Sequence, residues 1–250
     1  MDTVFPVFIA TRGRAGKSPT IPLLLADGLS PVLFVEPQEA AAYTDAYPQA
    51  QQIVLPLRDQ GLAFARQAEL AIARTLREEW VWLLDDDIGH FYTVLQGKCT
   101  KIAPSACLLG AQALFAALPN VAQASLEYQQ YAWSAKRPLV YDSYCDVAVC
   151  LHVGRTRTVN FRTELPLKGD RDFTLQLLSQ GYHVVRVTRY AFEAPQNGSN
   201  AGGLHDTYAI TGRELAACRM MAERWPGICE PIVKPSGRHD LKIHWKKLVG

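Results

Sequence analysis

The stretch VWLLDDDI at Val81–Ile88 carries four apolar residues directly into three consecutive carboxylates. Such a run is typical of a buried strand whose end opens onto a polar site. Because side chains alternate along a strand, we expect Asp85 and Asp87 to point one way and Asp86 the other. Two carboxylates on one face repel each other unless a proton or a cation lies between them, and Mg²⁺ or Mn²⁺ suits such oxygen ligands. A solvated acidic turn is the simpler alternative.

Strand and helix patterns alternate ahead of this stretch. Short apolar strands are predicted at 4–10, 31–35, 52–56 and 80–84, with helices at 20–29, 39–47 and 62–79. Strands separated by helices of this length predict a parallel sheet with right-handed crossovers. In such sheets ligands bind at the carboxyl ends of the strands, where the Thr11 loop, the Glu36 turn and the Asp85 cluster would converge.

The second half of the chain is more mixed. Helices are predicted at 106–118, 173–180 and 211–225, strands at 122–126, 147–152 and 182–187, and a Gly/Asn/Ser-rich loop at 196–204. No internal repeat or linker interrupts the pattern. We therefore expect one α/β domain over residues 1–250, with a Rossmann-like, mostly parallel central sheet flanked by helices and a mixed C-terminal half.

Composition sets limits on location and partners. The 250 residues are 48% hydrophobic and 20% charged, which suits a globular protein with a full core, and the net charge of +2 gives no global argument for nucleic acid. The six cysteines form no C-x-x-C motif, which argues against a zinc site or a disulfide framework and indicates reduced thiols. Without a secretory signal or an apolar run long enough to span a bilayer, we expect a cytoplasmic protein with no membrane partner.

Cations follow the first strand and begin the third helix. Arg12, Arg14 and Lys17 lie in a glycine-bearing loop that would suit the phosphates or base of a nucleotide, although its spacing is not that of a Walker loop. Arg66 could reach a diphosphate from its helix. The alternatives are a solvated basic turn and a surface arginine.

A second acidic pair and a late histidine complete the candidate site. Asp170 and Asp172 lie at a helix start, where carboxylates cap amide groups, and either could instead deprotonate an acceptor hydroxyl. His205 follows a glycine-rich loop and could complete a metal site begun by Asp85 and Asp87.

The C-terminal segment is basic. It contains Lys234, Arg238, His239, Lys242, His244, Trp245, Lys246 and Lys247. A solvated tail explains this composition, and contact with a phosphate backbone would require the same residue types.

Taken in order, these pieces resemble the GT-A family of nucleotide-sugar glycosyltransferases. The motifs are T-R-G-R at Thr11–Arg14, G-x-x-x-x-R at Gly61–Arg66, L-D-D-D at Leu84–Asp87, G-D-R-D at Gly169–Asp172 and G-G-x-H at Gly202–His205. The compact chain and the last motif look most like the TET/JBP-associated glycosyltransferases of bacteriophages, which are expected to glycosylate hydroxymethylated pyrimidines in phage DNA.

The resemblance implies a role for each matching residue. Asp85, Asp87 and His205 look like metal ligands, with Asp87 the more direct one. Asp170 matches the base of inverting members, but Gly169 replaces the usual glutamate, so Asp172 stays a candidate. The positions that look like nucleotide-sugar contacts are Thr11, Arg12, Arg14, Glu36, Arg66, Asp85 and Asp86.

The implied activity is a metal-dependent, inverting transfer from a UDP-sugar to a hydroxyl group, with Mn²⁺ or Mg²⁺ as cofactor. Residues 1–90 would bind the donor, and residues 91–250, with their basic end, would bind the acceptor. The expected acceptor is 5-hydroxymethylcytosine or a related base in phage DNA, in the host cytoplasm if a phage encodes the protein. Alternatives are a saccharide or small-molecule acceptor, a non-catalytic nucleotide- or DNA-binding module, and a nucleotidyltransferase.

Overall fold

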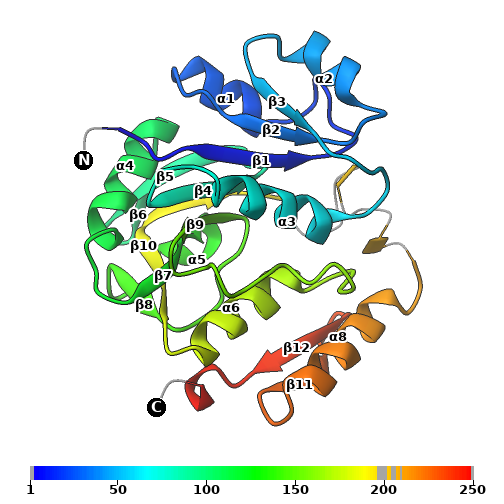
Figure 1. Cartoon of the computed structure of the whole chain (residues 1–250). Helices are drawn as coiled ribbons and strands as arrows, with labels where there is room; N and C mark the ends of the chain where they lie inside the picture. The colour runs from blue at the N-terminus through cyan, green and yellow to red at the C-terminus, as the bar shows by residue number, and fades with distance from the viewer. Residues whose placement is uncertain (1–2, 196–201, 204–206, 209, 249–250) are drawn as a thin grey trace.

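The computed structural model describes residues 3–195, 202–203, 207–208 and 210–248. In this part of the chain, ten strands form one mixed sheet in the order β3-β2-β1-β4-β9-β7-β10-β5-β6, with β8 paired to β10 (Figure 1). The strands are β1 (Val7–Thr11), β2 (Val32–Val35), β3 (Gln51–Val54), β4 (Trp80–Asp85), β5 (His90–Leu95), β6 (Lys98–Ile102), β7 (Val121–Tyr128), β8 (Leu139–Tyr141), β9 (Ala148–His152) and β10 (His183–Glu193).

The first four strands are parallel, as the alternating pattern predicts. Helices α1 (Thr20–Ala26), α2 (Ala40–Ala46) and α3 (Leu62–Ala73) connect them. Strand β9 pairs antiparallel with both β4 and β7, and β10 is parallel to β7 but antiparallel to β5 and β8. The predicted α/β class, with a parallel first half and a mixed second half, is confirmed.

Alternation along β4 sorts its side chains between two helical layers. Trp80, Trp82 and Leu84 pack in one core with residues of α1, α2 and α4 (Pro104–Phe115). Val81 and Leu83 pack in a second core with α3 and α6 (Gly169–Ser179). The same alternation turns Asp85, at the end of the strand, toward the α3 side of the sheet.

Two hairpins lie outside the predicted elements. Strands β5 and β6 are joined by a turn at Gln96 and Gly97, whose φ angles are 49° and 76°. Two successive positive φ angles match the right-handed twist of the paired strands in a tight hairpin. Gln-Gly is a weaker turn signal than Asn-Gly, which is why this hairpin was not predicted. Strands β11 (Cys229–Val233) and β12 (His239–Ile243) form the other one, within the segment expected to be a basic tail.

The C-terminal hairpin packs with α8 (Arg213–Arg224) against the α6 side of the molecule (Figure 1). A small apolar cluster joins these elements and consists of Leu165, Leu175, Cys218, Met221, Cys229 and Leu241. The short elements α5 (Gln129–Ala132) and η1 (Trp245–Lys247) complete the chain. The division into a donor half and an acceptor half stays a prediction.

The cysteines are reduced and mostly buried, as the composition predicts. All six cysteines are free thiols, and five of them are buried. Within the described residues, no helix has the length and apolar character needed to cross a membrane.

Candidate active site

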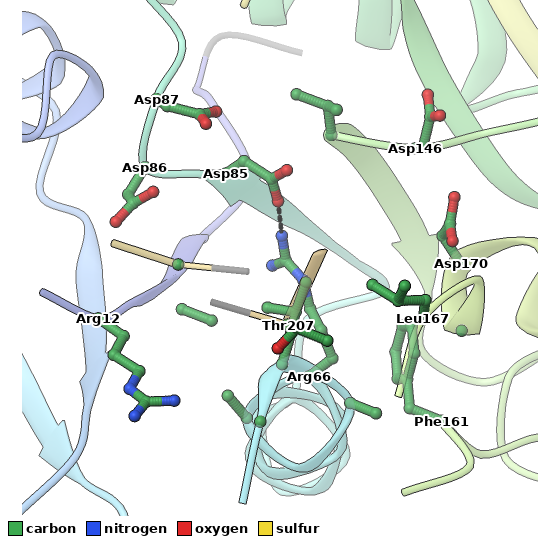
Figure 2. A pocket seen from close by; sticks show the side chains of 18 of the residues that line it. Arg12, Arg66, Asp85, Asp86, Asp87, Asp146, Phe161, Leu167, Asp170 and Thr207 are labelled. Atoms are coloured by element: carbon green, nitrogen blue, oxygen red, sulfur yellow. Dashed lines mark hydrogen bonds and ion pairs between the residues drawn. The ribbon is translucent and has the colours of Figure 1, made fainter. Parts of the chain in front are cut away.

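One pocket lies where β1, β2 and β4 end, and the start of α6 closes its far side (Figure 2). The convergence predicted for the Thr11 loop, the Glu36 turn and the Asp85 cluster is therefore present. The polar lining comprises Thr11, Arg12, Arg14, Glu36, Arg66, Asp85, Asp86, Asp87, Gln123, Tyr128, Asp146, Lys168, Asp170, Arg171, Thr207 and Tyr208. It contains every residue for which a nucleotide-sugar contact was predicted, together with Asp87 and Asp170.

Asp85 meets a buried arginine of α3. The guanidinium of Arg66 donates to the Asp85 carboxylate and, through its other nitrogen, to Glu69 at 2.8 Å. Arg66 is 7% exposed and Glu69 is fully buried, so Arg66 is not the surface arginine that was its alternative interpretation. A guanidinium held between two carboxylates keeps a fixed orientation at the pocket wall.

Asp86 and Asp87 meet the basic loop after β1. Arg14 donates to the Asp86 carboxylate and lies 3.3 Å from an Asp87 oxygen. The Thr11 hydroxyl donates to Asp86 at 2.5 Å, so this carboxylate points toward β1. Figure 2 shows Asp85 and Asp87 turned toward the space in front of Asp170, with Asp86 turned away. This is the alternation that was predicted for the three aspartates. Asp87 itself lies in the turn after β4.

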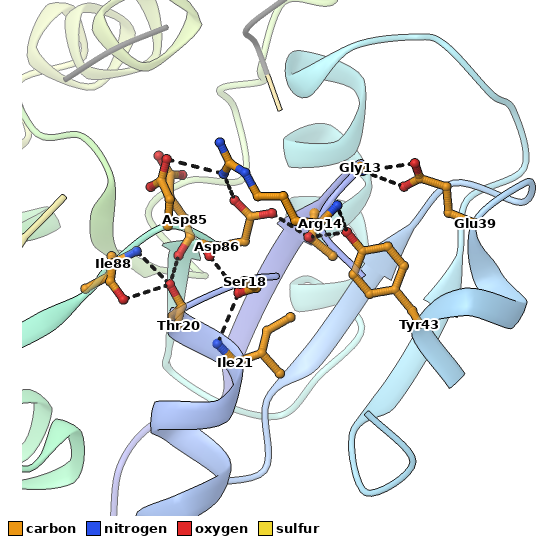
Figure 3. Close-up of polar contacts among 12 residues, drawn as sticks. Gly13, Arg14, Ser18, Thr20, Ile21, Glu39, Tyr43, Asp85, Asp86 and Ile88 are labelled. Atoms are coloured by element: carbon orange, nitrogen blue, oxygen red, sulfur yellow. Dashed lines mark hydrogen bonds and ion pairs between the residues drawn. The ribbon is translucent and has the colours of Figure 1, made fainter. Parts of the chain in front are cut away.

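Two hydroxyl groups, from Ser18 just before α1 and from Thr20 at its start, hydrogen-bond to the acidic turn (Figure 3). The Ser18 hydroxyl donates to the Asp86 carbonyl at 2.6 Å, and the Thr20 hydroxyl donates to the Asp85 carbonyl at 2.9 Å. The Ile88 amide in turn donates to the Thr20 oxygen at 2.7 Å. These contacts satisfy backbone groups that the turn would otherwise bury unpaired. No motif in the sequence marks either hydroxyl residue as part of the site.

The glycines of the G-G-x-H motif reach the same basic loop. The Gly203 amide donates to the Arg12 carbonyl at 3.0 Å. Gly202 has a φ of 85°, and a Cβ on it would lie 2.9 Å from the Arg12 carbonyl oxygen, so this approach requires glycine. Arg12 also lies 3.5 Å from Glu36 and 2.7 Å from Asp59. His205 lies outside the described residues.

The acidic turn concentrates negative charge in a partly buried site. Burial raises the pKa of Asp85 to about 7; Arg66 opposes this shift, and Asp87 and Asp86 add to it. Burial also raises the pKa of Asp87, against the nearby charge of Arg14. A cation in the pocket would therefore stabilise the ionised form of both carboxylates.

The oxygen donors fit a hard divalent ion in kind. Asp85 and Asp87 line one pocket and repel each other, which is the arrangement that Mg²⁺ or Mn²⁺ relieves. Among the residues described, no group of three or more His, Cys, Asp or Glu side chains could enclose a metal.

Asp146 is a further carboxylate that the sequence analysis missed. It precedes β9 and lies with Asp170 on the side of the pocket across from the acidic turn (Figure 2). Burial and then the charge of Asp170 raise the pKa of Asp146 to about 7, and the Tyr128 hydroxyl forms a hydrogen bond with it. The sequence signal for Asp146 was its position as a charged residue directly before a predicted buried strand. Its importance emerges only from the antiparallel pairing of β9 with β4.

The two aspartates at the start of α6 have different surroundings. Asp170 lines the pocket. Asp172 is fully buried and accepts hydrogen bonds from Arg162 at 2.6 Å, Trp225 at 2.8 Å and Gln176 at 2.8 Å. These partners give Asp172 a structural environment, which favours Asp170 as the candidate base.

The fold and the pocket agree with a comparison to known families. A family model described as TET-Associated Glycosyltransferase matches residues 5–203. The match assigns the chain to a class of proteins described as glycosyltransferases. More particularly, the chain belongs to the TET-associated glycosyltransferase family.

Comparison with solved structures gives a more distant similarity. The apo-form glycosyltransferase GlyE of Streptococcus pneumoniae TIGR4 is 12% identical, with a TM-score of 0.42. The match covers 88% of this chain and 64% of the GlyE chain, so this chain spans less than two thirds of the length of GlyE. No curated protein sequence shows a significant match.

Proposed function

We propose that this glycosyltransferase moves a sugar from a UDP-sugar to 5-hydroxymethylcytosine, or a related hydroxymethylpyrimidine, in phage DNA. The observation that supports the proposal is the composition of one pocket. Guanidinium groups and the acidic turn lie on its sheet side, and the carboxylates Asp146 and Asp170 lie across from them. A donor with a charged diphosphate and an acceptor hydroxyl would occupy these two sides. The free thiols are compatible with the cytoplasm of an infected host.

The donor would bind at the ends of β1, β2 and β4. Arg12, Arg14 and Arg66 present guanidinium groups to the pocket and suit phosphate oxygens, because their planar forks can donate two hydrogen bonds. Glu36, 5% exposed at the end of β2, would accept hydrogen bonds from the nucleoside. Thr11 and Asp86 are bonded to each other and support this loop from behind.

Asp85 and Asp87 would hold the divalent ion, with His205 as a predicted third ligand. A bound Mn²⁺ or Mg²⁺ would neutralise charge on the departing diphosphate. Arg14 and Arg66 already face these carboxylates, so the protein supplies positive charge at the same place. This arrangement would orient the donor with its anomeric carbon toward Asp170.

Asp170 would act as the general base. The acceptor oxygen would bond to the anomeric carbon as the bond between that carbon and the diphosphate oxygen breaks. The acceptor proton would pass to Asp170, and UDP would leave with the electron pair. Attack from the face opposite the leaving group inverts the anomeric centre, by the single-displacement logic of inverting glycosidases. Asp146, adjacent to Asp170, would orient a hydroxyl of either substrate.

The acceptor side of the pocket has an apolar wall. Phe161 and Leu167 line it beside Asp170 (Figure 2), and Leu165 also lines the pocket. A flipped-out pyrimidine presents a flat apolar face and would pack there, whereas a base in the duplex could not reach the pocket. This wall favours a base over a small, fully polar acceptor.

The test is release of UDP from a panel of UDP-sugars with Mn²⁺, on plain DNA and on DNA that contains 5-hydroxymethylcytosine. We expect release that needs the modified base, and we expect Asp87→Asn to abolish it. Mass spectrometry of the DNA should show one added hexose for each modified base. Transfer to a saccharide or small molecule without DNA would contradict the proposed acceptor, and release of pyrophosphate would contradict the proposed reaction.

A further inference from the structure

One segment of the chain is almost free of acidic residues. Between Asp87 and Asp142 the sequence contains a single acid, Glu127, together with the cations Lys98, Lys101, Lys136 and Arg137. Glu127 is 3% exposed and accepts a hydrogen bond from Arg186 at 2.7 Å. The four cations are exposed, and none forms an ion pair within the described part of the chain.

Several basic residues of the C-terminal segment differ in this respect. Lys234 pairs with Asp240 at 2.5 Å, and Arg238 pairs with Glu214 at 2.8 Å. His244 lies 2.8 Å from Glu230, which is also 3.7 Å from Lys242. These internal ion pairs neutralise much of the positive charge that could otherwise contact DNA.

Tertiary structure brings two parts of the acid-poor segment together, namely α5 and the β5–β6 hairpin. Helix α5 packs on the β5–β6 hairpin, where Ala132 clusters with Val94 and the Cys99 thiol lies 4.0 Å from the Gln129 carbonyl. A Cβ on Gly97, in the hairpin turn, would lie 3.1 Å from the Trp133 carbonyl oxygen. Trp133 is therefore adjacent to the turn that precedes Lys98.

Two aromatic rings are exposed on this surface. Tyr131 is 54% exposed and Trp133 is 61% exposed. The indole N–H of Trp133 donates to the Gln130 carbonyl at 2.9 Å, which fixes the edge of the ring. A large aromatic side chain held in place and left exposed is a typical contact for a stacked ligand.

The aromatic rings continue to the pocket. Tyr128 lines the pocket, and its ring centroid lies 6.1 Å from that of Tyr131 in an edge-to-face arrangement. Tyr128 therefore connects the pocket to Tyr131, and Trp133 follows Tyr131 closely in the chain.

We propose that this surface binds a single-stranded stretch of the nucleic-acid acceptor next to the flipped base. We call it the α5 surface and define it by Lys98, Tyr131, Trp133, Lys136 and Arg137. Bases would stack on the two rings, and the cations would contact phosphates. A neutral glycan could stack on the rings but would not use the cations, so the charge favours nucleic acid. This inference rests on the proposed acceptor, and it adds the surface on which the nucleic-acid strand would lie.

The experiment measures binding of a fluorescent single-stranded oligonucleotide that contains one 5-hydroxymethylcytosine, by anisotropy at several salt concentrations. Trp133→Ala should raise Kd by about 5- to 150-fold, the range expected from losing one stacked base. Trp133→Phe keeps a stacking face and should stay near the wild-type value. Lys136→Glu with Arg137→Glu should weaken binding and flatten its salt dependence.

Arg157→Glu is the matched charge control. Arg157 is exposed and follows β9, whose antiparallel pairing with β4 puts its end at the opposite edge of the sheet from Asp85. This variant should bind like the wild type. Thermal unfolding of each variant checks that the fold is intact. Unchanged Kd in the Trp133 and Lys136/Arg137 variants, or equal weakening by Arg157→Glu, would overturn the proposal. Displacement of the oligonucleotide by neutral dextran would indicate a glycan surface instead.

Sugar transfer to the same oligonucleotide separates this inference from the proposed function. Binding that depends on Trp133 without any transfer would refute the proposed reaction and keep the surface. Transfer with a wild-type KM for DNA in every α5 variant would keep the reaction and refute the surface. With both correct, the α5 variants should raise KM for DNA and leave KM for the UDP-sugar unchanged.

Discussion

The backbone amide of Asp85 donates a 2.8 Å hydrogen bond to the carbonyl oxygen of Val147. Val147 has a φ of 61°, in the left-handed region that β-branched residues rarely occupy. Such backbone strain persists where the surrounding structure enforces it, commonly at functional sites. Here the contact ties the end of β4 to the residue after Asp146 and so sets one carboxylate of the pocket relative to another.

Asp146→Asn should lower kcat while KM for the UDP-sugar changes little. The substitution keeps the size of the side chain but removes the carboxylate beside Asp170. We expect a loss of about tenfold, less than the roughly 10²–10⁴-fold that a positioned general acid or base contributes. Asp142→Asn is the control, because Asp142 pairs with His183 at 3.1 Å and is absent from the pocket lining. Equal kcat in both variants would remove Asp146 from the proposed site.

Asp170→Asn and Asp172→Asn should fail in different ways. Loss of the proposed base should lower kcat by roughly 10²–10⁴-fold with unchanged Tm. Asp172→Asn should instead lower Tm, because Arg162 and Trp225 both donate to the carboxylate that it removes. Steady-state kinetics and thermal unfolding of both variants give the comparison. A folded Asp170→Asn protein with full activity would exclude Asp170 as the base.

Arg66→Met should destabilise the fold by roughly 3–5 kcal/mol, the cost of leaving a buried partner charge uncompensated. The partner most affected is Glu69, which is fully buried and 2.8 Å from Arg66. Urea unfolding measures the change. The double variant Arg66→Met with Glu69→Gln should recover part of the loss, since it removes the orphaned charge as well. A double variant no more stable than the single one would contradict this explanation.

Asp240 should make the free energy of unfolding decrease as the pH falls into the acidic range. Burial alone would raise its pKa, but the hydrogen bond from Lys234 and the charges of Arg171 and Lys168 outweigh burial and hold the pKa well below its ordinary value. A depressed carboxyl pKa adds stability that is complete above the unfolded-state pKa of about 4 and is lost as pH falls toward the folded-state value.

Asp240→Asn should therefore cost most stability at neutral pH. The difference in unfolding free energy from the wild type should shrink as the pH falls below about 4. Urea unfolding from pH 3 to 7 (the range around the ordinary carboxyl pKa of ~3.9) provides the measurement. A difference that is constant with pH would show that Asp240 contributes only as a neutral hydrogen-bond acceptor. The same variant tests the link to the site, because Lys168 and Arg171 flank Asp170.

The sequence predicts much of the first half of the fold because the signals there are local. Apolar runs, helical spacing and loop residues define the β1–β4 succession without information from elsewhere in the chain. The parallel arrangement then follows from connection rules, and it places the Thr11 loop, the Glu36 turn and the Asp85 cluster at one edge. The motifs also predict the family correctly.

The sequence by itself thus determined the α/β class, the acidic turn and its basic neighbours. Only the tertiary structure decided which carboxylates share the pocket, because that depends on pairing between distant strands. The antiparallel β4–β9 register brings Asp146 to the site, and the packing of α6 on Arg162 and Trp225 takes Asp172 away from it. It also decided that Lys234 and Arg238 pair internally while the cations near α5 stay exposed, because charge availability depends on neighbours that lie far away in sequence.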